Sequence, residues 1–174
     1  CNWCSGKYQP IPGEANMESN TVRIPAYKFR GELYTDTTEL VQALASDWDN
    51  GKKQLYRGLL TGFFMACDPE IAEACMDAED NVTKHGENED VAFWKLLYKM
   101  APGMDALFWK NQKYESLNAF GTDLMEKLRS GNVDECPVWN EMLSYGLISS
   151  YMKAHKFSEA QVKGAESIES SVRL

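Results

Sequence analysis

Residues 29–48, FRGELYTDTTELVQALASDW, decide the fold, because residues 109–128, WKNQKYESLNAFGTDLMEKL, repeat their pattern. The matching residues lie 80 positions apart: Phe29 and Trp109, Gly31 and Asn111, Tyr34 and Tyr114, Leu40 and Phe120, Leu44 and Leu124, Trp48 and Leu128. A second pair of stretches, LYRGLLTGFF (55–64) and LSYGLISSYM (143–152), matches at an offset of 88. The sequence therefore predicts a duplicated module, whose second copy carries about eight extra residues near GNVDECPV (131–138).

A short β-hairpin opens each predicted copy. In the first copy, Tyr27 and Phe29 alternate with polar residues before Gly31, as on a strand with one buried face. Gly31 and its counterpart Asn111 are residue types that tolerate positive φ, so both suit the same position of a tight turn. The sequence therefore predicts the same turn in both copies.

A helix is expected after each hairpin. Asp36 followed by Glu39 matches a capping box, and Ser116 is a favourable N-cap residue, so the helix should begin at the same point of both copies. Apolar residues at every fourth position then give each helix one stripe. The stripes consist of Leu40, Leu44 and Trp48 in the first copy, and of Phe120, Leu124 and Leu128 in the second. Both stripes are expected to lie in the core.

The later helices of the two copies also carry matching signals. Pro137 suits the first turn of the next helix in the second copy. Gly58 and Gly146 then stand where a left-handed C-terminal cap is expected. Asp68 and Ser158 are the expected N-caps of the last helix in each copy.

Residues 88–103, NEDVAFWKLLYKMAPG, have no counterpart in the other copy. Apolar residues surround almost the whole of this predicted helix, Asn88 is its expected N-cap, and a Pro-Gly dipeptide ends it. A helix that is apolar almost all round is normally buried on several sides. We therefore expect a mainly α fold, in which a buried central helix (88–103) joins two copies of a short β-hairpin plus helices, at 27–87 and 104–174.

Composition excludes several classes of function. The chain of 174 residues has a formal net charge of −8, so it lacks the excess of Lys and Arg that nucleic-acid binding requires. Acidic residues are densest from Asp68 to Asp90, which favours a solvated surface there. No apolar run approaches the roughly 20 residues that span a bilayer. We expect neither a nucleic-acid partner nor a membrane span.

The cysteines indicate a reducing compartment. Their number, five, is odd, and Cys67, Cys75 and Cys136 stand in apolar or helical contexts without regular spacing. Cysteines of this kind behave as small core residues, and disulfides are rare inside cells. A cytoplasmic location is therefore expected.

The sequence shows no set of residues that would support catalysis. It contains two histidines: His85 stands in a polar loop, and His155 stands near a helix end, where an imidazolium suits the helix dipole. Neither accompanies the serine motif of nucleophilic enzymes. A phosphate-binding glycine loop and an EF-hand calcium loop are also absent from the sequence. We therefore expect that the chain is not an enzyme.

The first residues of the chain, CNWCSGKYQP (1–10), carry a C-x-x-C pair. They resemble the last knuckle of a bacterial zinc ribbon, whose usual pattern is C-x-x-C-G followed by a basic and an aromatic residue. The residues that carry this resemblance are Cys1, Cys4, Gly6, Lys7 and Tyr8, with Ser5 shifting the glycine by one place. The resemblance implies that residues 1–8 are part of a knuckle with Cys1 and Cys4 as zinc ligands. Zinc takes four ligands, so two more would come from outside this chain.

Other interpretations of this cysteine pair stay open. A thioredoxin-like redox pair expects a strand before it and a helix after it, whereas residues 9–26 are rich in Pro, Gly, Asn and Ser, as a linker is. A lipoprotein would begin at a modified Cys1, with the linker as its tether to the bacterial cell surface. Cys1 can also be simply the point at which this chain begins.

The rest of the chain resembles a helical module of bacterial multidomain proteins that also carry zinc ribbons. The segments that carry this resemblance are YKFRGELY (27–34), KKQLYRGLL (52–60) and FWKLLY (93–98). It implies an appendage to larger machinery and no established activity. We expect a protein-interaction or accessory module that binds a protein, or a second copy of itself, through exposed Trp and Tyr or through the acidic surface. The alternatives are a ligand-binding protein or enzyme with a cleft between the copies, and a structural surface lipoprotein.

Overall fold

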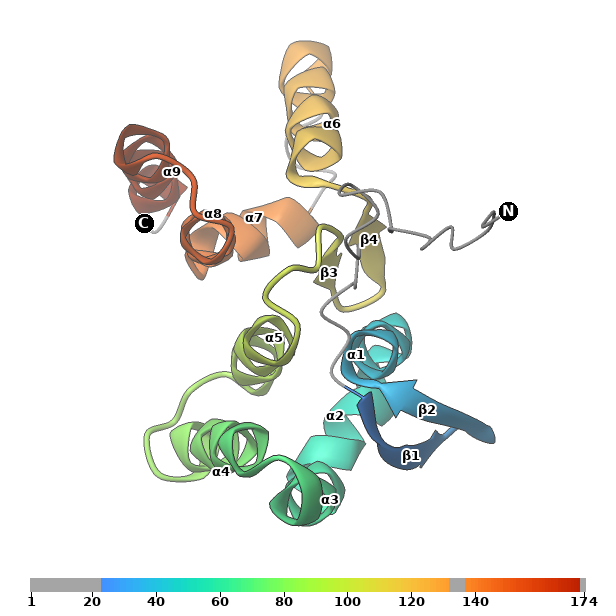
Figure 1. Cartoon of the computed structure of the whole chain (residues 1–174). Helices are drawn as coiled ribbons and strands as arrows, with labels where there is room; N and C mark the ends of the chain where they lie inside the picture. The colour runs from blue at the N-terminus through green and yellow to red at the C-terminus, as the bar shows by residue number, and fades with distance from the viewer. Residues whose placement is uncertain (1–22, 132–136, 173–174) are drawn as a thin grey trace, which may run out of the picture.

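The computed structural model describes residues 23–131 and 137–172 (Figure 1). They form helices and two small hairpins, so the predicted mainly α fold is confirmed. The first half contains β1 (Arg23–Phe29), β2 (Glu32–Asp36), α1 (Thr37–Ser46), α2 (Trp48–Tyr56), α3 (Leu59–Cys67) and α4 (Pro69–Thr83). After the central helix α5 (Glu89–Met100), the second half contains β3 (Leu107–Trp109), β4 (Gln112–Tyr114), α6 (Leu117–Ser130), α7 (Pro137–Ser144), α8 (Leu147–Ala154) and α9 (Glu159–Val172). Strand β1 thus begins at Arg23, before the expected module start at residue 27.

The two antiparallel hairpins have the same register. The paired residues are Tyr27 with Tyr34, Lys28 with Leu33 and Phe29 with Glu32 in β1–β2, and Leu107 with Tyr114, Phe108 with Lys113 and Trp109 with Gln112 in β3–β4. Both turns begin with a left-handed residue, Arg30 at φ 52° and Lys110 at φ 53°. Gly31 follows at φ 86°, a conformation that glycine adopts without strain. Asn111 is not left-handed, so the expectation that it shares the positive φ of Gly31 is wrong. The left-handed position that both turns share is the residue before, Arg30 or Lys110.

The predicted caps are present in both halves. The side chains of Asp36 and Ser116 each accept a hydrogen bond from the backbone N–H three residues later, at 2.9 and 3.1 Å. Asn88 caps α5 in the same way. Gly58 and Gly146 are both left-handed, with φ of 72° and 70°, between the second and third helices of their halves. Local sequence signals therefore set the element boundaries, as expected.

A hydrogen bond that the sequence pattern did not indicate joins the third and fourth helices in both halves, from a side chain in the first half and from the backbone in the second. Thr61 Oγ1 on α3 donates to Glu79 on α4 at 3.2 Å, and the Ser149 backbone N–H on α8 donates to Glu169 on α9 at 2.8 Å. Ser149 follows Thr61 by 88 positions, the offset of the second sequence match. The halves therefore share the element order β-β-α-α-α-α, the hairpin register, the caps and this contact.

Helix α5 lies at the centre of the core. Its buried residues are Val91, Ala92, Phe93, Trp94, Leu96, Leu97, Tyr98 and Met100, which confirms the predicted buried helix. It packs against α1, α2 and α4, and Figure 1 shows it between the two halves. The Tyr98 hydroxyl donates to the Ala106 carbonyl and accepts from the Phe108 N–H, which ties α5 to the start of the second half.

The first apolar stripe is buried, but it does not lie on one helix. Leu40, Leu44 and Trp48 are all in the core, yet α1 ends at Ser46 and Trp48 begins α2. The expectation of a single helical stripe is therefore wrong at its last residue. The bend brings Gly51 of α2 against Leu44: a Cβ at position 51 would lie 2.4 Å from the Leu44 carbonyl oxygen.

The second stripe is buried only at its start. Phe120 is buried, Leu124 is partly buried, and Leu128 is 49% exposed, so the prediction that this stripe is core is wrong at its end. Helix α6 has 14 residues where α1 has 10, which accounts for part of the extra length of the second copy. Figure 1 shows α6 extending away from the body, whereas α1 packs against both strands of its hairpin and against α2 and α5.

The acidic segment extends along α4 to the start of α5. Glu70, Glu73 and Asp77 are exposed on α4, as a solvated surface requires. Asp90 is less exposed and takes part in the cluster described below. Across 23–131 and 137–172, no helix combines the length and the apolar character that crossing a bilayer demands.

Candidate functional site

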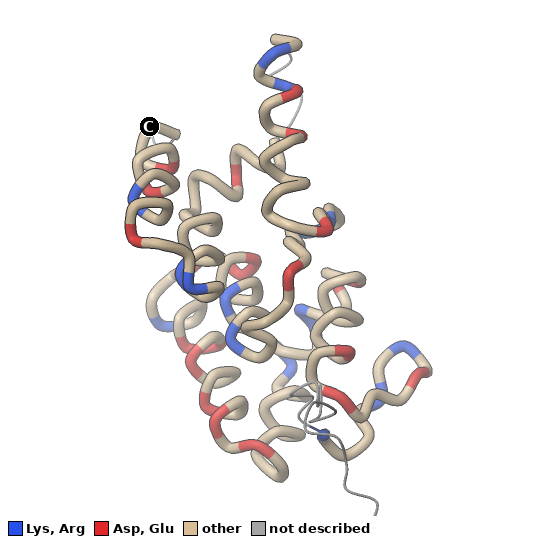
Figure 2. The backbone as a smooth tube through the Cα atoms, turned by 45° about the horizontal axis from the view of Figure 1, so that its top comes forward, with Lys and Arg blue, Asp and Glu red and all other residues tan. Residues whose placement is uncertain are grey.

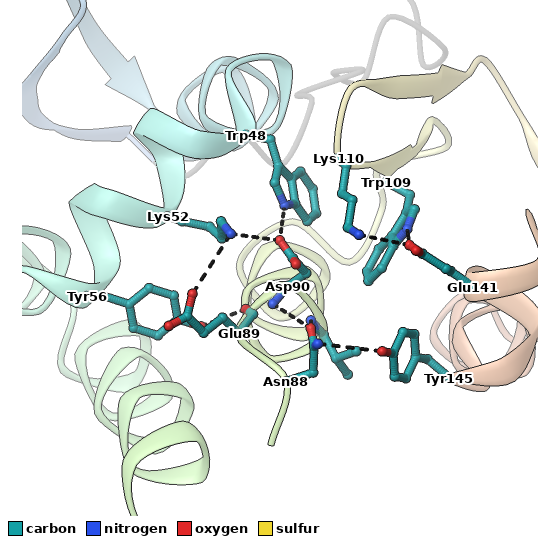
Figure 3. Close-up of polar contacts among 11 residues, drawn as sticks. Trp48, Lys52, Tyr56, Asn88, Glu89, Asp90, Trp109, Lys110, Glu141 and Tyr145 are labelled. Atoms are coloured by element: carbon teal, nitrogen blue, oxygen red, sulfur yellow. Dashed lines mark hydrogen bonds and ion pairs between the residues drawn. The ribbon is translucent and has the colours of Figure 1, made fainter. Parts of the chain in front are cut away.

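The most connected polar groups lie at the N-terminus of α5, where the two halves meet (Figure 3). We call Trp48, Lys52, Asp90, Trp109, Lys110, Glu141 and Tyr145 the junction cluster. On the first-half side, Asp90 accepts a hydrogen bond from Trp48 Nε1 at 2.7 Å and lies 2.9 Å from Lys52 Nζ. Asp90 stands in the first turn of α5, where a carboxylate suits the helix dipole. This carboxylate therefore fastens α2 to α5.

The second-half side of the cluster repeats this indole–carboxylate pairing. Trp109 Nε1 donates to Glu141 at 2.8 Å, and Lys110 Nζ lies 2.9 Å from the same carboxylate. The rings of Trp48 and Trp109 meet edge to face, with centroids 5.8 Å apart. Aromatic pairs of this geometry add to the stability that burial provides. The cluster thus joins α2, α5, the β3–β4 turn and α7 (Figure 3).

Electrostatics favours a structural role for the junction cluster. Burial raises the pKa of Asp90, but hydrogen bonds from Trp48 and Lys52 outweigh it, so the pKa lies below its ordinary value. The hydrogen bond to Glu141 raises the pKa of Lys110. At neutral pH, Asp90 is therefore a carboxylate and Lys110 an ammonium group, each with opposite charge beside it. Neither group is poised to transfer a proton.

Replacing Asp90 with Asn should destabilise the fold by about 1 to 3 kcal/mol at pH 7, because Lys52 loses the nearer of its two carboxylates in a partly buried site and Trp48 loses a charged acceptor. A carboxylate with a depressed folded pKa stabilises the protein above its unfolded pKa, near 3.9, and this stability is lost as the pH falls through the folded pKa. The difference in the free energy of unfolding between wild type and Asp90→Asn should therefore disappear below about pH 4. Urea unfolding of both proteins from pH 3 to 7 measures this difference in the free energy of unfolding.

The matched control for this prediction is Asp80→Asn, because Asp80 forms an exposed pair with Lys84 at 2.8 Å on α4. Exposed pairs contribute little, so this change should cost less than about 0.5 kcal/mol. A difference in the free energy of unfolding between wild type and Asp90→Asn that does not change with pH would contradict the stabilising role of the Asp90 carboxylate. Equal losses of stability for Asp90→Asn and Asp80→Asn would also contradict it.

The two cysteines that the structure describes are not activated as nucleophiles. Burial raises the pKa of Cys75 to about 12, and burial also raises that of Cys67. A thiol reacts as its thiolate, so both are weak nucleophiles at neutral pH. His85 is exposed in the turn after α4. The ring nitrogens of His155 each lie 3.0 Å from a backbone carbonyl, so this side chain is engaged at the end of α8.

A groove lies between α1 and the second hairpin. It has a volume of about 360 Å³, and Thr38, Gln42, Ser46, Asp105, Phe108 and Lys113 contribute to its walls. This is where a cleft between the two copies was expected. Its walls are mainly polar, and none of the histidine or cysteine side chains named above lines it. The groove therefore offers hydrogen-bonding groups without an activated residue.

A larger groove runs along α6. It has a volume of about 610 Å³ and is lined by Asn118, Gly121, Thr122, Met125, Glu126 and Arg129. Met125 is 50% exposed and adjoins the exposed Leu128 on the same helix. Exposed apolar side chains that gather beside a groove are typical of binding surfaces. We call Leu124, Met125 and Leu128 the α6 apolar end.

The predicted zinc ligands Cys1 and Cys4, and the predicted linker up to residue 22, lie outside the described residues. Within 23–131 and 137–172, no group of three or more His, Cys, Asp or Glu side chains could hold a metal ion. The zinc knuckle therefore stays a prediction.

Four of the five tryptophans can be placed, and all four are buried: Trp48, Trp94, Trp109 and Trp139. Exposed tryptophan anchors are thus not found among them, whereas Tyr145 is exposed in the junction cluster.

Comparison of the chain with protein-family models, curated proteins and solved structures gives no match.

Proposed function

We propose that the chain is a duplicated, non-catalytic protein-interaction module of a larger bacterial protein, and that the α6 apolar end binds the partner. The observation that carries this proposal is the exposure of Met125 and Leu128 on a helix that packs against the body mainly at its start. Burying such side chains against a partner stabilises a complex by roughly 25 cal/mol for each Å² removed from water.

The chemistry of the described residues supports binding over catalysis. In the junction cluster, the Asp90 carboxylate and the Lys110 ammonium are neutralised by opposite charges, and the thiol of Cys75 is protonated at neutral pH. General acid–base catalysis requires a group whose pKa lies near the working pH. The shared element order of the two halves supports the duplication, and the proposed zinc ligands Cys1 and Cys4 would belong to a neighbouring ribbon.

Replacing Leu128 with Glu should abolish partner binding without unfolding the protein. Leu128 is half exposed, so the change should alter stability by less than about 0.5 kcal/mol. A charge placed in an apolar contact loses its hydration, so the partner should fall at least tenfold in abundance after affinity purification from native cells. Quantitative mass spectrometry of the purified fractions measures this.

Leu33→Glu is the matched control, because Leu33 is 66% exposed on the first hairpin, away from α6. It should leave the bound proteins unchanged. If wild type and both variants bind the same set of proteins, the α6 apolar end does not bind the partner.

A further inference from the structure

Helix α3 of the first half has no charged side, yet it is only partly buried. Its sequence, LLTGFFMAC, contains no Asp, Glu, Lys or Arg. A helix of this kind is normally covered all round. Here α3 packs against α2, α4 and β1, its buried residues are Leu60, Thr61 and Phe64, and Figure 1 shows it at the edge of the first half. The other side of α3 is therefore open to solvent.

The open side of α3 is a continuous apolar strip. Leu59 is 50% exposed and Met65 is 64% exposed. Gly62 and Ala66 on the same side are exposed as well. These positions recur every three or four residues, as the residues along one side of a helix do. A Cβ at position 62 would meet no atom within 4 Å, so no residue that the structure describes covers the middle of the strip.

Met76 of α4, which is 42% exposed, extends this strip. Met76 stands three residues before Glu79, which accepts the hydrogen bond from Thr61 on α3. Met65 stands four residues after Thr61, so both methionines are displaced from this contact toward the turn at Asp68. Because residues three or four apart share one side of a helix, the two methionines lie beside the line along which α3 meets α4. We define the α3 apolar face as Leu59, Gly62, Met65, Ala66 and Met76.

The second half carries an ion pair at the positions of these two methionines. Lys153 follows Met65 by 88 positions, the offset of the second sequence match. Glu166 follows Met76 by 90 positions, which is also the spacing of the two glutamates that join the third and fourth helices. Lys153 Nζ lies 2.6 Å from the Glu166 carboxylate. The same surface is thus charged in one copy and apolar in the other, and an exposed apolar patch is typical of an interaction site.

We propose that the α3 apolar face is a second interaction surface, which binds an amphipathic helix of a partner protein that carries Lys and Arg on the flank beside α4. This inference goes beyond the proposed function, because the surface lies on the first half and does not involve the α6 apolar end. Binding through the apolar side of an amphipathic helix is a common mode of recognition.

Shape favours a helix as the element that the partner contributes. Gly62 and Ala66 are small, exposed residues one turn apart in the middle of the face. Packed helices have axes roughly 8 to 10 Å apart, and the distance depends on the side chains at the contact. The small residues allow a partner helix to approach α3 closely, while Leu59 and Met65 supply apolar surface beside them.

Charge favours a basic flank on the partner and disfavours a second copy of this chain. Helix α4 borders the face and contains Asp and Glu but no Lys or Arg, and Figure 2 shows acidic residues recurring along it. Glu70, Glu73 and Asp77 on α4 are exposed. A complementary helix places Lys or Arg opposite these carboxylates. Two copies joined through this face would instead bring two acidic α4 helices together, at a net charge of −8 for each copy.

A labelled designed peptide tests this proposal by fluorescence anisotropy with the full chain. The peptide is an amphipathic helix about 20 residues long, with Leu and Ala on one side and Lys on the rest. We expect saturable binding that is at least about tenfold weaker for Met65→Glu, because a charge in an apolar contact loses its hydration. Leu128→Glu, a matched change at an exposed position of α6, should leave peptide binding unchanged. Circular dichroism of each variant checks that it is folded.

Gly62→Leu separates a closely packed helix from general apolar adsorption. The change adds apolar surface at an exposed helical position, so adsorption of the peptide would become stronger. A helix packed closely against α3 instead loses the space above Gly62, so its binding should weaken at least about tenfold. Equal or stronger binding of the peptide by Gly62→Leu would overturn the helix inference.

The basic flank is tested by a second peptide in which Glu replaces every Lys. This peptide should not bind the chain, because its charge is the same as that of α4. Glu73→Lys should weaken binding of the Lys peptide at low ionic strength, where surface charges are least screened. Glu126→Lys on α6 is the matched control, because Glu126 is also an exposed helical residue, and it should change binding less.

Absence of saturable binding, equal binding by wild type and Met65→Glu, or equal binding of the two peptides would overturn the inference. A concentration-dependent dimer of the chain alone that Met65→Glu dissolves, seen by sedimentation velocity, would assign the α3 apolar face to a second copy and overturn it as well. Each of these results leaves the proposed function of the α6 apolar end standing, because Leu128→Glu tests that function separately in native cells.

Discussion

Replacing Gly51 with Ala should lower the free energy of unfolding by about 3 kcal/mol, although it adds a single methyl group. The new Cβ would lie 2.4 Å from the Leu44 carbonyl oxygen and 2.9 Å from the Phe93 ring. The first of these contacts is with backbone, so α2 can accept the methyl group only by moving away from α1 and α5. Urea unfolding of the variant and wild type measures the loss.

Gly62→Ala is the matched control, since it adds the same group to the interior of α3. A Cβ at position 62 meets no atom within 4 Å, and Gly62 is exposed. Alanine is the better helix former, so this variant should be more stable than wild type by about 0.5 to 1 kcal/mol. Changes of the same sign at both positions would mean that α1, α2 and α5 do not pack as closely as described.

The parts of the fold that depend on neighbouring residues could be predicted from the sequence. The N-cap at Ser116, the left-handed Gly58 and the turn at Gly31 each result from residues within four positions of one another. The burial of α5 could also be predicted, because a helix that is apolar on all sides has no face to turn to water.

The difference in burial between the two apolar stripes could not be predicted from neighbouring residues. Leu44 and Leu124 occupy the same position of the same sequence pattern, yet Leu44 is buried and Leu124 is only partly buried. What separates them is that α1 packs against β1, β2, α2 and α5, whereas α6 contacts mainly β4. The contact of α1 with α5 joins segments about 50 residues apart. A pattern within one helix shows which side is apolar, but it does not show whether anything covers that side.

The junction cluster was missed for the same reason. Trp48 and its acceptor Asp90 are 42 positions apart, and Trp109 and Glu141 are 32 apart. The N-cap at Asn88 did place Asp90 in the first turn of α5, but nothing in the sequence indicated which donors would reach it. Most tryptophans were expected in the core, and the four that can be placed are buried there. Trp48 and Trp109 donate their indole N–H groups to carboxylates, whereas those of Trp94 and Trp139 are buried without an acceptor among the described residues.

The two halves consequently differ in how far their apolar side chains are covered. The first half is completed by its own helix, and the junction cluster fixes that helix to both halves. The second half repeats the scaffold but leaves Leu128 and Ile168 at the surface.

The unfolding of Leu44→Ala and Leu124→Ala, measured side by side in urea, tests the central claim that the apolar stripe is covered along its length in the first half alone. Leu44 is fully buried, so its truncation leaves a cavity and should cost about 3 to 5 kcal/mol. Leu124 is partly exposed, so its truncation removes little buried area and should cost about 1 kcal/mol or less. Equal losses of 3 kcal/mol or more for the two variants would contradict the account, because the second stripe would then be as well covered as the first.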